Sequence, residues 1–274
     1  MENEQFEALY VAEQIKKLST VFPYSSFSVL YRTNAQSRVI EEAFLHFSIP
    51  YLLIGGTRFY ERKEIKDIIS MLRLLINSED SVSQERVKKL GKRKWEIFLK
   101  TQKNLLDKVS KLQTNELMEE LFNNTGYLKL YNPDSEEDYA RLENIKELRS
   151  VALIYTNLIE FLQQIALVES EYSEDEKKGK SKDGVKLMTL HQAKGLEFPY
   201  VFIVGVEEGI LPHSRSIDDV YTLEEERRLF YVGITRAKKK LYVTYAKKRF
   251  MFGRRGSASK SRFLGEEENN DYIV

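Results

Sequence analysis

Residues 185–205, VKLMTLHQAKGLEFPYVFIVG, contain two short apolar runs separated by a polar stretch. The runs Val185 to Leu190 and Tyr200 to Gly205 predict buried strands, because short apolar segments bounded by polar residues or glycine are typical of parallel sheets. Further strands are predicted at 27–31, 51–54 and 240–245, and helices at 3–19, 35–47, 61–76 and 223–235. Strands that alternate with helices predict an α/β fold with a parallel sheet.

The middle of the chain has a different pattern. Between Ser78 and Gly184 the sequence favours helices at 115–122, 136–150 and 153–167, and the charged stretch 169–182 is expected to be a linker or mobile loop. We therefore expect one α/β domain, residues 1–77 and 185–265, interrupted by an all-helical insertion subdomain, residues 78–184. An acidic tail, residues 266–274, is expected to follow.

The composition excludes several classes of function. The 274 residues include 43 Lys and Arg, 42 Asp and Glu, and no cysteine, so disulfides, thiolate chemistry and cysteine zinc sites are excluded. Three scattered histidines do not suggest a metal site, and none is expected. The apolar runs are too short to span a membrane and no signal peptide is apparent, so a cytoplasmic protein without membrane contact is expected.

Positive charge is concentrated near the end of the chain. Residues 227–265 include thirteen Lys and Arg but no Asp or Glu, which is typical of a surface that faces phosphates. The alternative is a solvated helix face followed by charged strand ends. Aromatic residues are interleaved with these cations, and bases stack on such rings in single-strand binders, although most of the rings are expected in the core.

Three polar stretches are hard to explain by packing alone: YRTNAQSR at 31–38, TLHQAKGLEF at 189–198 and EEERRLFYVGITRA at 224–237. Together with GGTRFYERKEIKD at 55–67 and EEGILPHSR at 207–215, they resemble the UvrD/PcrA/Rep group of superfamily-one DNA helicases, in that family's order. The resemblance covers nearly the whole chain. It implies a second RecA-like domain, with a helical subdomain inserted, and a first RecA-like domain that the sequence lacks.

The sequence is not expected to contain a phosphate-binding loop. Such a loop needs a glycine five residues before Gly-Lys-Ser/Thr. Gly179-Lys180-Ser181 has Glu174 at that position, and Gly91-Lys92 is followed by arginine. No predicted strand ends in an Asp-Glu pair suited to magnesium. The chain alone is therefore not expected to hydrolyse ATP efficiently.

The resemblance implies a nucleotide site shared with another domain. Arg236 matches the arginine that reaches the γ-phosphate across the cleft, which makes it the catalytic candidate; its planar, permanently charged group suits that role. Glu197 matches the glutamate that contacts the ribose, and Gly195 would permit close approach of the backbone. Lys194 and Gln192 could simply be solvated. ATP with Mg²⁺ is expected only when the missing N-terminal RecA-like ATPase domain completes the site.

The resemblance also implies a track for single-stranded DNA. Thr189, His191, Arg32 and Asn34 match positions that contact the strand, and Phe252 matches an aromatic that stacks on a base. The alternatives are a structural histidine at 191 and a core phenylalanine at 252. Arg227 and Arg228 are expected to form ion pairs with Glu224 to Glu226 at helical spacing.

The resemblance implies the C-terminal portion of an ATP-dependent 3′–5′ DNA helicase or translocase. Its partners would be single-stranded DNA, a duplex junction and the N-terminal RecA-like domain. The insertion departs from the family pattern, because it is shorter than expected and strongly basic from Glu85 to Lys103. Two alternatives are a free-standing, non-enzymatic module that binds single-stranded DNA or regulates a helicase, and a decayed gene fragment. A neighbouring reading frame that encodes a Walker A half would favour the helicase.

Overall fold

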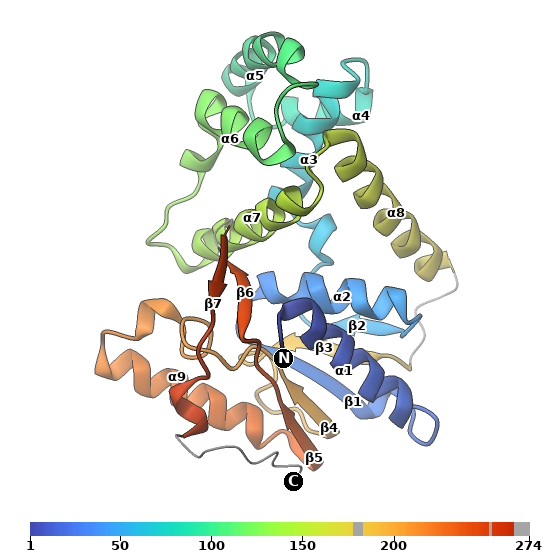
Figure 1. Ribbon diagram of the computed structural model, residues 1–274, viewed down its shortest axis with the longest axis vertical. Coiled ribbons are helices and arrows are strands. Elements are labelled where there is room, and N and C mark those ends of the chain that lie inside the picture. Colours follow the sequence, from blue (N-terminus) through green and yellow to red (C-terminus); the bar gives the residue numbers. More distant parts are fainter. Residues whose placement is uncertain (178–182, 252–253, 266–274) are drawn as a thin grey trace. The chain divides into compact units, whose positions relative to one another are not determined.

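A five-stranded parallel sheet forms the centre of the α/β part of the chain (Figure 1). The computed structural model describes residues 1–177, 183–251 and 254–265. The strand order is β2-β3-β1-β4-β5, and β1 pairs with β3 at Val29–Leu187 and with β4 at Val29–Phe202. The strands are β1 (Phe27–Tyr31), β2 (Tyr51–Leu53), β3 (Val185–Thr189), β4 (Phe198–Ile203) and β5 (Ala237–Val243). The predicted α/β fold with a parallel sheet is confirmed.

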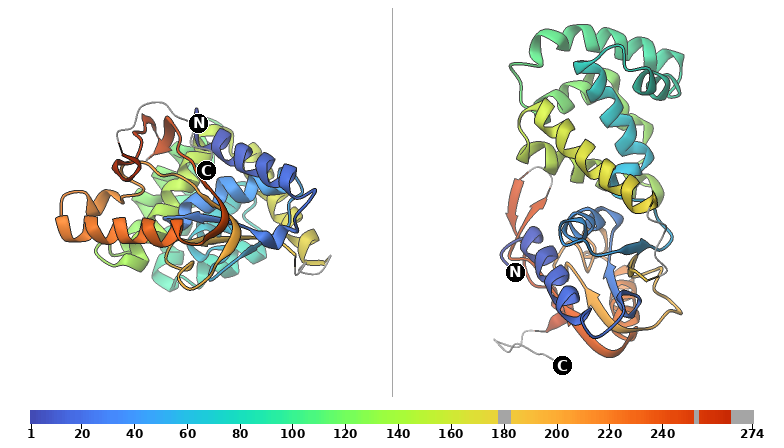
Figure 2. Two further views of the ribbon diagram at one scale, coloured as in Figure 1. Left: turned by 90° about the horizontal axis from the view of Figure 1, so that it is seen from below. Right: turned by 90° about the vertical axis from the view of Figure 1, so that its right-hand side faces the viewer.

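Each face of the sheet has its own apolar core, because successive side chains of a strand point to opposite faces. Val29 lies in the core beneath α1 (Glu4–Leu18) and α2 (Ser37–His46). Its neighbour Leu30 lies in the second core, with residues of α9 (Val220–Ile234). The sheet is therefore covered by α1 and α2 on one face and by α9 on the other (Figure 2).

The chain divides into two compact units. Unit 1 contains the sheet and comprises Met1–Arg58, Asp175–Phe250 and Arg255–Val274, whereas unit 2 comprises Phe59–Glu174 and Met251–Arg254. The helices of unit 2 are α3 (Lys63–Ile76), α4 (Ser81–Lys88), α5 (Lys92–Leu105), α6 (Thr114–Thr125), α7 (Glu136–Ile154) and most of α8 (Leu158–Lys177). Helix α3 packs against α4 and α7, which is why it groups with the helical unit although the sequence analysis placed it before the insertion.

The prediction of a linker after residue 168 is wrong for the described part of that stretch. The stretch 169–177 was expected to be a linker, but it continues the helix to Lys177. Phe161, Ile165, Val168 and Tyr172 recur at helical spacing and are all buried, so the apolar face continues beneath the charged residues. Residues 178–182 lie outside the described part of the chain.

Among the described residues, no single helix is long and apolar enough to cross a membrane, although α7 and the first part of α8, bent at 119°, pass that test together by length and composition.

Short elements complete the structure. A hairpin of β6 (Lys248–Met251) and β7 (Arg254–Ser257) follows β5. The short 3-10 helices are η1 (Tyr24–Ser26), η2 (Asn34–Gln36), η3 (Phe59–Glu61), η4 (Leu106–Lys108), η5 (Tyr127–Leu130), η6 (Ser214–Ser216) and η7 (Arg262–Leu264).

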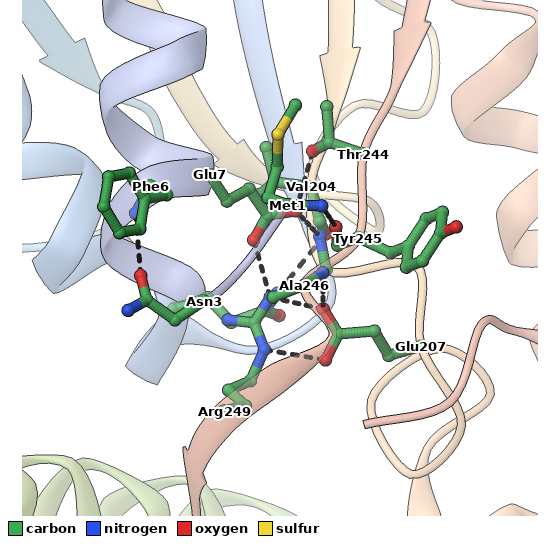
Figure 3. Close-up of polar contacts among 12 residues, drawn as sticks. Met1, Asn3, Phe6, Glu7, Val204, Glu207, Thr244, Tyr245, Ala246 and Arg249 are labelled. Atoms are coloured by element: carbon green, nitrogen blue, oxygen red, sulfur yellow. Dashed lines mark hydrogen bonds and ion pairs between the residues drawn. The ribbon is translucent and has the colours of Figure 1, made fainter. Parts of the chain in front are cut away.

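A buried charge cluster joins the first helix to the hairpin (Figure 3). Arg249 of β6 donates to Glu7 of α1 at 2.6 Å and to both carboxylate oxygens of Glu207 at 2.7 and 2.8 Å. Burial by itself would lower the pKa of Arg249, but the two carboxylates outweigh it and raise the pKa above its usual value. Thr244 and the amide of Gly205 also donate to Glu7, so this carboxylate is well satisfied although it is buried.

Candidate nucleotide and nucleic-acid interface

The predicted site residues lie at two opposite edges of the sheet. Arg32 and Asn34 follow β1, and Thr189 and His191 lie at the end of β3, so all four are at the carboxyl edge. The stretch 189–198 then crosses to the amino edge, where β4 begins at Phe198. These four DNA candidates therefore lie at one edge of the sheet, and the nucleotide candidates Gly195, Glu197 and Arg236 lie at the other.

Gln192 fastens the end of β3 to the turn after β2. Its Oε1 accepts bonds from the backbone amide of Thr189 at 2.9 Å and from the Thr189 hydroxyl at 3.1 Å, while its Nε2 donates to the carbonyl of Gly55 at 2.9 Å. Gly55 has φ +67°, and a Cβ there would lie 2.4 Å from this Nε2. Gln192 is thus a structural cross-link rather than the solvated side chain that the sequence analysis allowed, whereas the side chain of His191 is exposed.

The loop after β1 is organised by a second glutamine. Gln36 Oε1 accepts bonds from the amides of Arg32 and Thr33 at 3.0 and 2.9 Å. Its Nε2 donates to the carbonyl of Val204 at 3.3 Å, next to Gly205, where a Cβ would clash with it at 2.3 Å. Asn34, which opens η2, is half-buried.

Arg236 and the Gly195–Glu197 stretch meet at the amino edge. The Arg236 guanidinium donates to the carbonyls of Val232 at 2.8 Å and Leu196 at 3.1 Å, and to the Thr235 hydroxyl at 2.8 Å. All three acceptors are neutral oxygens, so they orient the planar cation without neutralising its charge. The structure thus brings together the residues predicted to contact the phosphate and the ribose.

Gly195 and Glu197 are both exposed at this edge. Gly195 has φ +85°, which side-chain-bearing residues rarely adopt, and a Cβ there would meet open space. Glu197 forms an ion pair with Lys238 at 3.1 Å, in which both side chains are more than half exposed. An exposed pair of this kind is worth little, so a ligand hydroxyl can compete for the carboxylate.

Helix α9 approaches the 189–198 stretch closely at Gly233. A Cβ at Gly233 would lie 2.5 Å from Leu190 Cδ2 and 3.0 Å from Ile203 Cδ1, both in the buried core. Arg236 follows the last turn of α9. The close contact at Gly233 therefore fixes the position of the Arg236 backbone.

We expect Gly233→Ala to lower the free energy of unfolding by about 1–2 kcal/mol, because overpacking of a core outweighs the better helix propensity of alanine. Thermal unfolding followed by circular dichroism measures the change. In a Leu190→Val background, which shortens the opposing side chain, the same substitution should cost less. An equal cost in both backgrounds would contradict the close contact.

Six of the thirteen cations in the basic block 227–265 form ion pairs with carboxylates that lie outside the block. Among the described residues, the pairs are Arg227–Glu224, Arg228–Glu225, Lys238–Glu197, Lys248–Glu2, Arg249 with Glu7 and Glu207, and Arg262–Glu208. The predicted ion pairs of Arg227 and Arg228 are confirmed. The density of cations in the sequence therefore overstates the positive charge that this region presents to solvent.

One predicted site residue is not described by the structure, and one glutamate has a different partner from the one predicted. Phe252, the predicted stacking residue, lies outside the described residues. Glu226 was expected to serve Arg227 or Arg228, but it binds Arg32, 194 positions away in sequence. No signal along the chain points to that pairing, because only the fold brings the two residues together.

A five-stranded parallel sheet with helices on both faces is consistent with a RecA-like domain. A family model described as the UvrD-like helicase C-terminal domain matches residues 1–124 and 88–248. The chain belongs to the UvrD-like helicase C-terminal domain family.

Curated relatives agree with this assignment. The chain is similar to the ATP-dependent DNA helicase PcrA of Bacillus subtilis (strain 168), with 39% identity across 97% of this chain and 43% of the relative. PcrA of Staphylococcus epidermidis is 38% identical and PcrA of Staphylococcus aureus 36%, each across 96% of this chain and 42% of the relative. The chain thus spans less than half the length of these relatives. The Bacillus alignment runs over 315 positions, more than the 274 residues of the chain, so the relative has residues within the matched region that this chain lacks.

Proposed function

We propose that this chain acts as the second RecA-like portion of an ATP-dependent 3′–5′ DNA helicase or translocase. In this role Arg236 stabilises the charge on the transferred γ-phosphoryl group of ATP–Mg²⁺, and Glu197 and Gly195 contact the nucleotide. Unit 1 is the RecA-like body and unit 2 is the helical insertion. Another RecA-like domain, with the phosphate-binding loop, completes the site.

The observation that carries this proposal is the meeting of two distant motifs at one exposed edge. Arg236 donates to the carbonyl of Leu196, directly beside Glu197, and Gly233 packs against Leu190 of the same stretch. A cation oriented by neutral oxygens beside an exposed carboxylate suits a nucleotide whose remaining phosphates are held by another body.

The outer face of α9 supports contact with a protein partner, because Tyr231 lies five residues before Arg236 and two further exposed side chains lie at the start of the helix. Val220, Tyr221 and Tyr231 are large apolar side chains that are 73%, 85% and 66% exposed. Exposed aromatic residues near a functional group are typical of an interaction surface. We propose that the N-terminal RecA-like domain docks there.

The carboxyl edge supports contact with single-stranded DNA. His191 and Asn34 come from adjacent strands β3 and β1, whose ends lie side by side in the sheet. Thr189 and Arg32 belong to the same two strand ends, and Phe252 would add a stacking ring. In unit 2, the α4–α5 turn presents the exposed cations Lys88, Lys89, Lys92 and Arg93, which suit the phosphates of a duplex junction.

ATP hydrolysis in the presence of single-stranded DNA tests the proposal. The purified chain is assayed alone and in a mixture with the separately expressed N-terminal half of the Bacillus relative. Activity that appears only in the mixture is the expected result. If both reactions are inactive while the chain still binds single-stranded DNA, the motor function is contradicted and a non-enzymatic binding module becomes the better account.

A further inference from the structure

The carboxylate of Glu226 lies buried beneath the loop that follows β1. Its side chain is 6% exposed, and its two oxygens accept hydrogen bonds from Arg32 Nη2 at 2.6 Å and from Arg32 Nε at 2.9 and 3.1 Å. The backbone amide of His213 donates to the same carboxylate at 3.1 Å. Glu226 of α9 therefore binds two loops at the carboxyl edge of the sheet: the loop after β1, through Arg32, and the loop that contains His213.

This geometry places Arg32 in a different role from that of a phosphate ligand. A guanidinium bound through two of its nitrogens to a carboxylate is strongly oriented, and the Arg32 side chain is itself only 20% exposed. If Arg32 moved to a DNA phosphate, the buried carboxylate of Glu226 would lose its cation, which is costly in a low-dielectric site.

The pair acts on the loop that contains Asn34. At one end of this loop, the amides of Arg32 and Thr33 are held by Gln36. The Arg32 side chain fixes the same loop to α9, the helix whose end precedes Arg236. The orientation of the loop thus depends on Glu226.

We propose that Glu226 is a positioning residue for nucleic-acid binding, and that Arg32 anchors the β1 loop to α9 instead of binding a DNA phosphate. The nucleic-acid part of this inference rests on the proposed function.

The first test measures binding of a fluorescent oligo-dT strand at several salt concentrations, well below the unfolding temperature. Arg32→Ala and Glu226→Gln should each weaken binding by a similar factor, about five- to tenfold, and the double variant Arg32→Ala/Glu226→Gln should be no weaker than either single variant. The dependence of affinity on salt should not change, because no phosphate contact is lost. Arg32→Lys, which keeps a cation near Glu226, should recover part of the affinity.

Two results would overturn the inference. If Arg32 binds phosphate, Arg32→Ala reduces the salt slope by about 0.7, and Glu226→Gln, which releases the arginine, leaves affinity unchanged or improves it. If the pair is merely structural, both variants lower the unfolding temperature and leave affinity unchanged.

A second measurement does not require DNA. Hydrogen exchange at the amides of Arg32 and Thr33 should become at least several-fold faster in Glu226→Gln, because the loop loses its anchor. Glu224→Gln is the matched control, since Glu224 lies on the same helix in an exposed pair with Arg227. If the wild-type chain binds no DNA, the proposed function fails, and this measurement still decides the anchor: unchanged exchange in Glu226→Gln would refute it.

Discussion

Replacement of Arg236 by alanine should abolish ATP hydrolysis in the reconstituted mixture, with a fall in kcat of about a thousandfold or more. The reason is electrostatic. The guanidinium is held by the carbonyls of Val232 and Leu196, which leave its charge uncompensated for a developing phosphoryl charge. Steady-state hydrolysis with saturating single-stranded DNA measures the effect.

Two variants make this result specific. Arg228→Ala removes an exposed arginine of α9 that pairs with Glu225, and it should change kcat by less than about twofold. Arg236→Lys keeps the charge but loses the planar fork, so it should restore little activity. Full activity of Arg236→Ala would contradict the assigned role, whereas an equal loss in Arg228→Ala would indicate damage to the docking face.

Replacement of Arg249 by methionine should have the largest effect on stability, a loss of about 3–5 kcal/mol in the free energy of unfolding. Glu7 and Glu207 would remain buried without their shared cation, although Thr244 and two backbone amides still donate to them. Denaturation with urea, followed by circular dichroism, measures the change.

The same substitution at Arg262 is the control. Arg262 is 42% exposed and pairs with Glu208 at 2.7 Å, so Arg262→Met should cost much less stability than Arg249→Met. Adding Glu7→Gln and Glu207→Gln to Arg249→Met should recover part of the lost stability, because the carboxylates are then neutral. Equal costs for Arg249→Met and Arg262→Met would contradict the importance of the buried cluster.

The sheet could be predicted because its strands are short apolar runs that end at polar residues or glycine. The same logic missed β6 and β7, since KRFM and RRGS are charged segments that form a separate two-stranded sheet. It also ended α8 too early, because the charges between Glu169 and Lys177 obscured the buried Tyr172.

The site was predictable only in part. The positions of Thr189 and Arg32 at strand ends place them at the carboxyl edge, and the same argument places Arg236 before β5. The hydrogen-bond and ion-pair partners of these residues could not be predicted from the sequence, because pairs such as Arg32–Glu226 form between segments that are distant along the chain. A local count of charges could not show which cations are already matched.

The strand order also has a consequence for biosynthesis. β1 and β2 are not neighbours in the sheet, because β1 lies between β3 and β4 and β2 pairs with β3. Neither strand can therefore form its hydrogen bonds in the sheet until residues beyond 184 have been synthesised. At about 5–20 residues per second, a ribosome needs on the order of ten seconds to translate the intervening helical unit. During that interval the nascent chain carries two apolar strands with unpaired edges, while unit 2 is complete enough to fold. Early strands of this kind are candidate binding sites for ribosome-associated chaperones until β3 emerges.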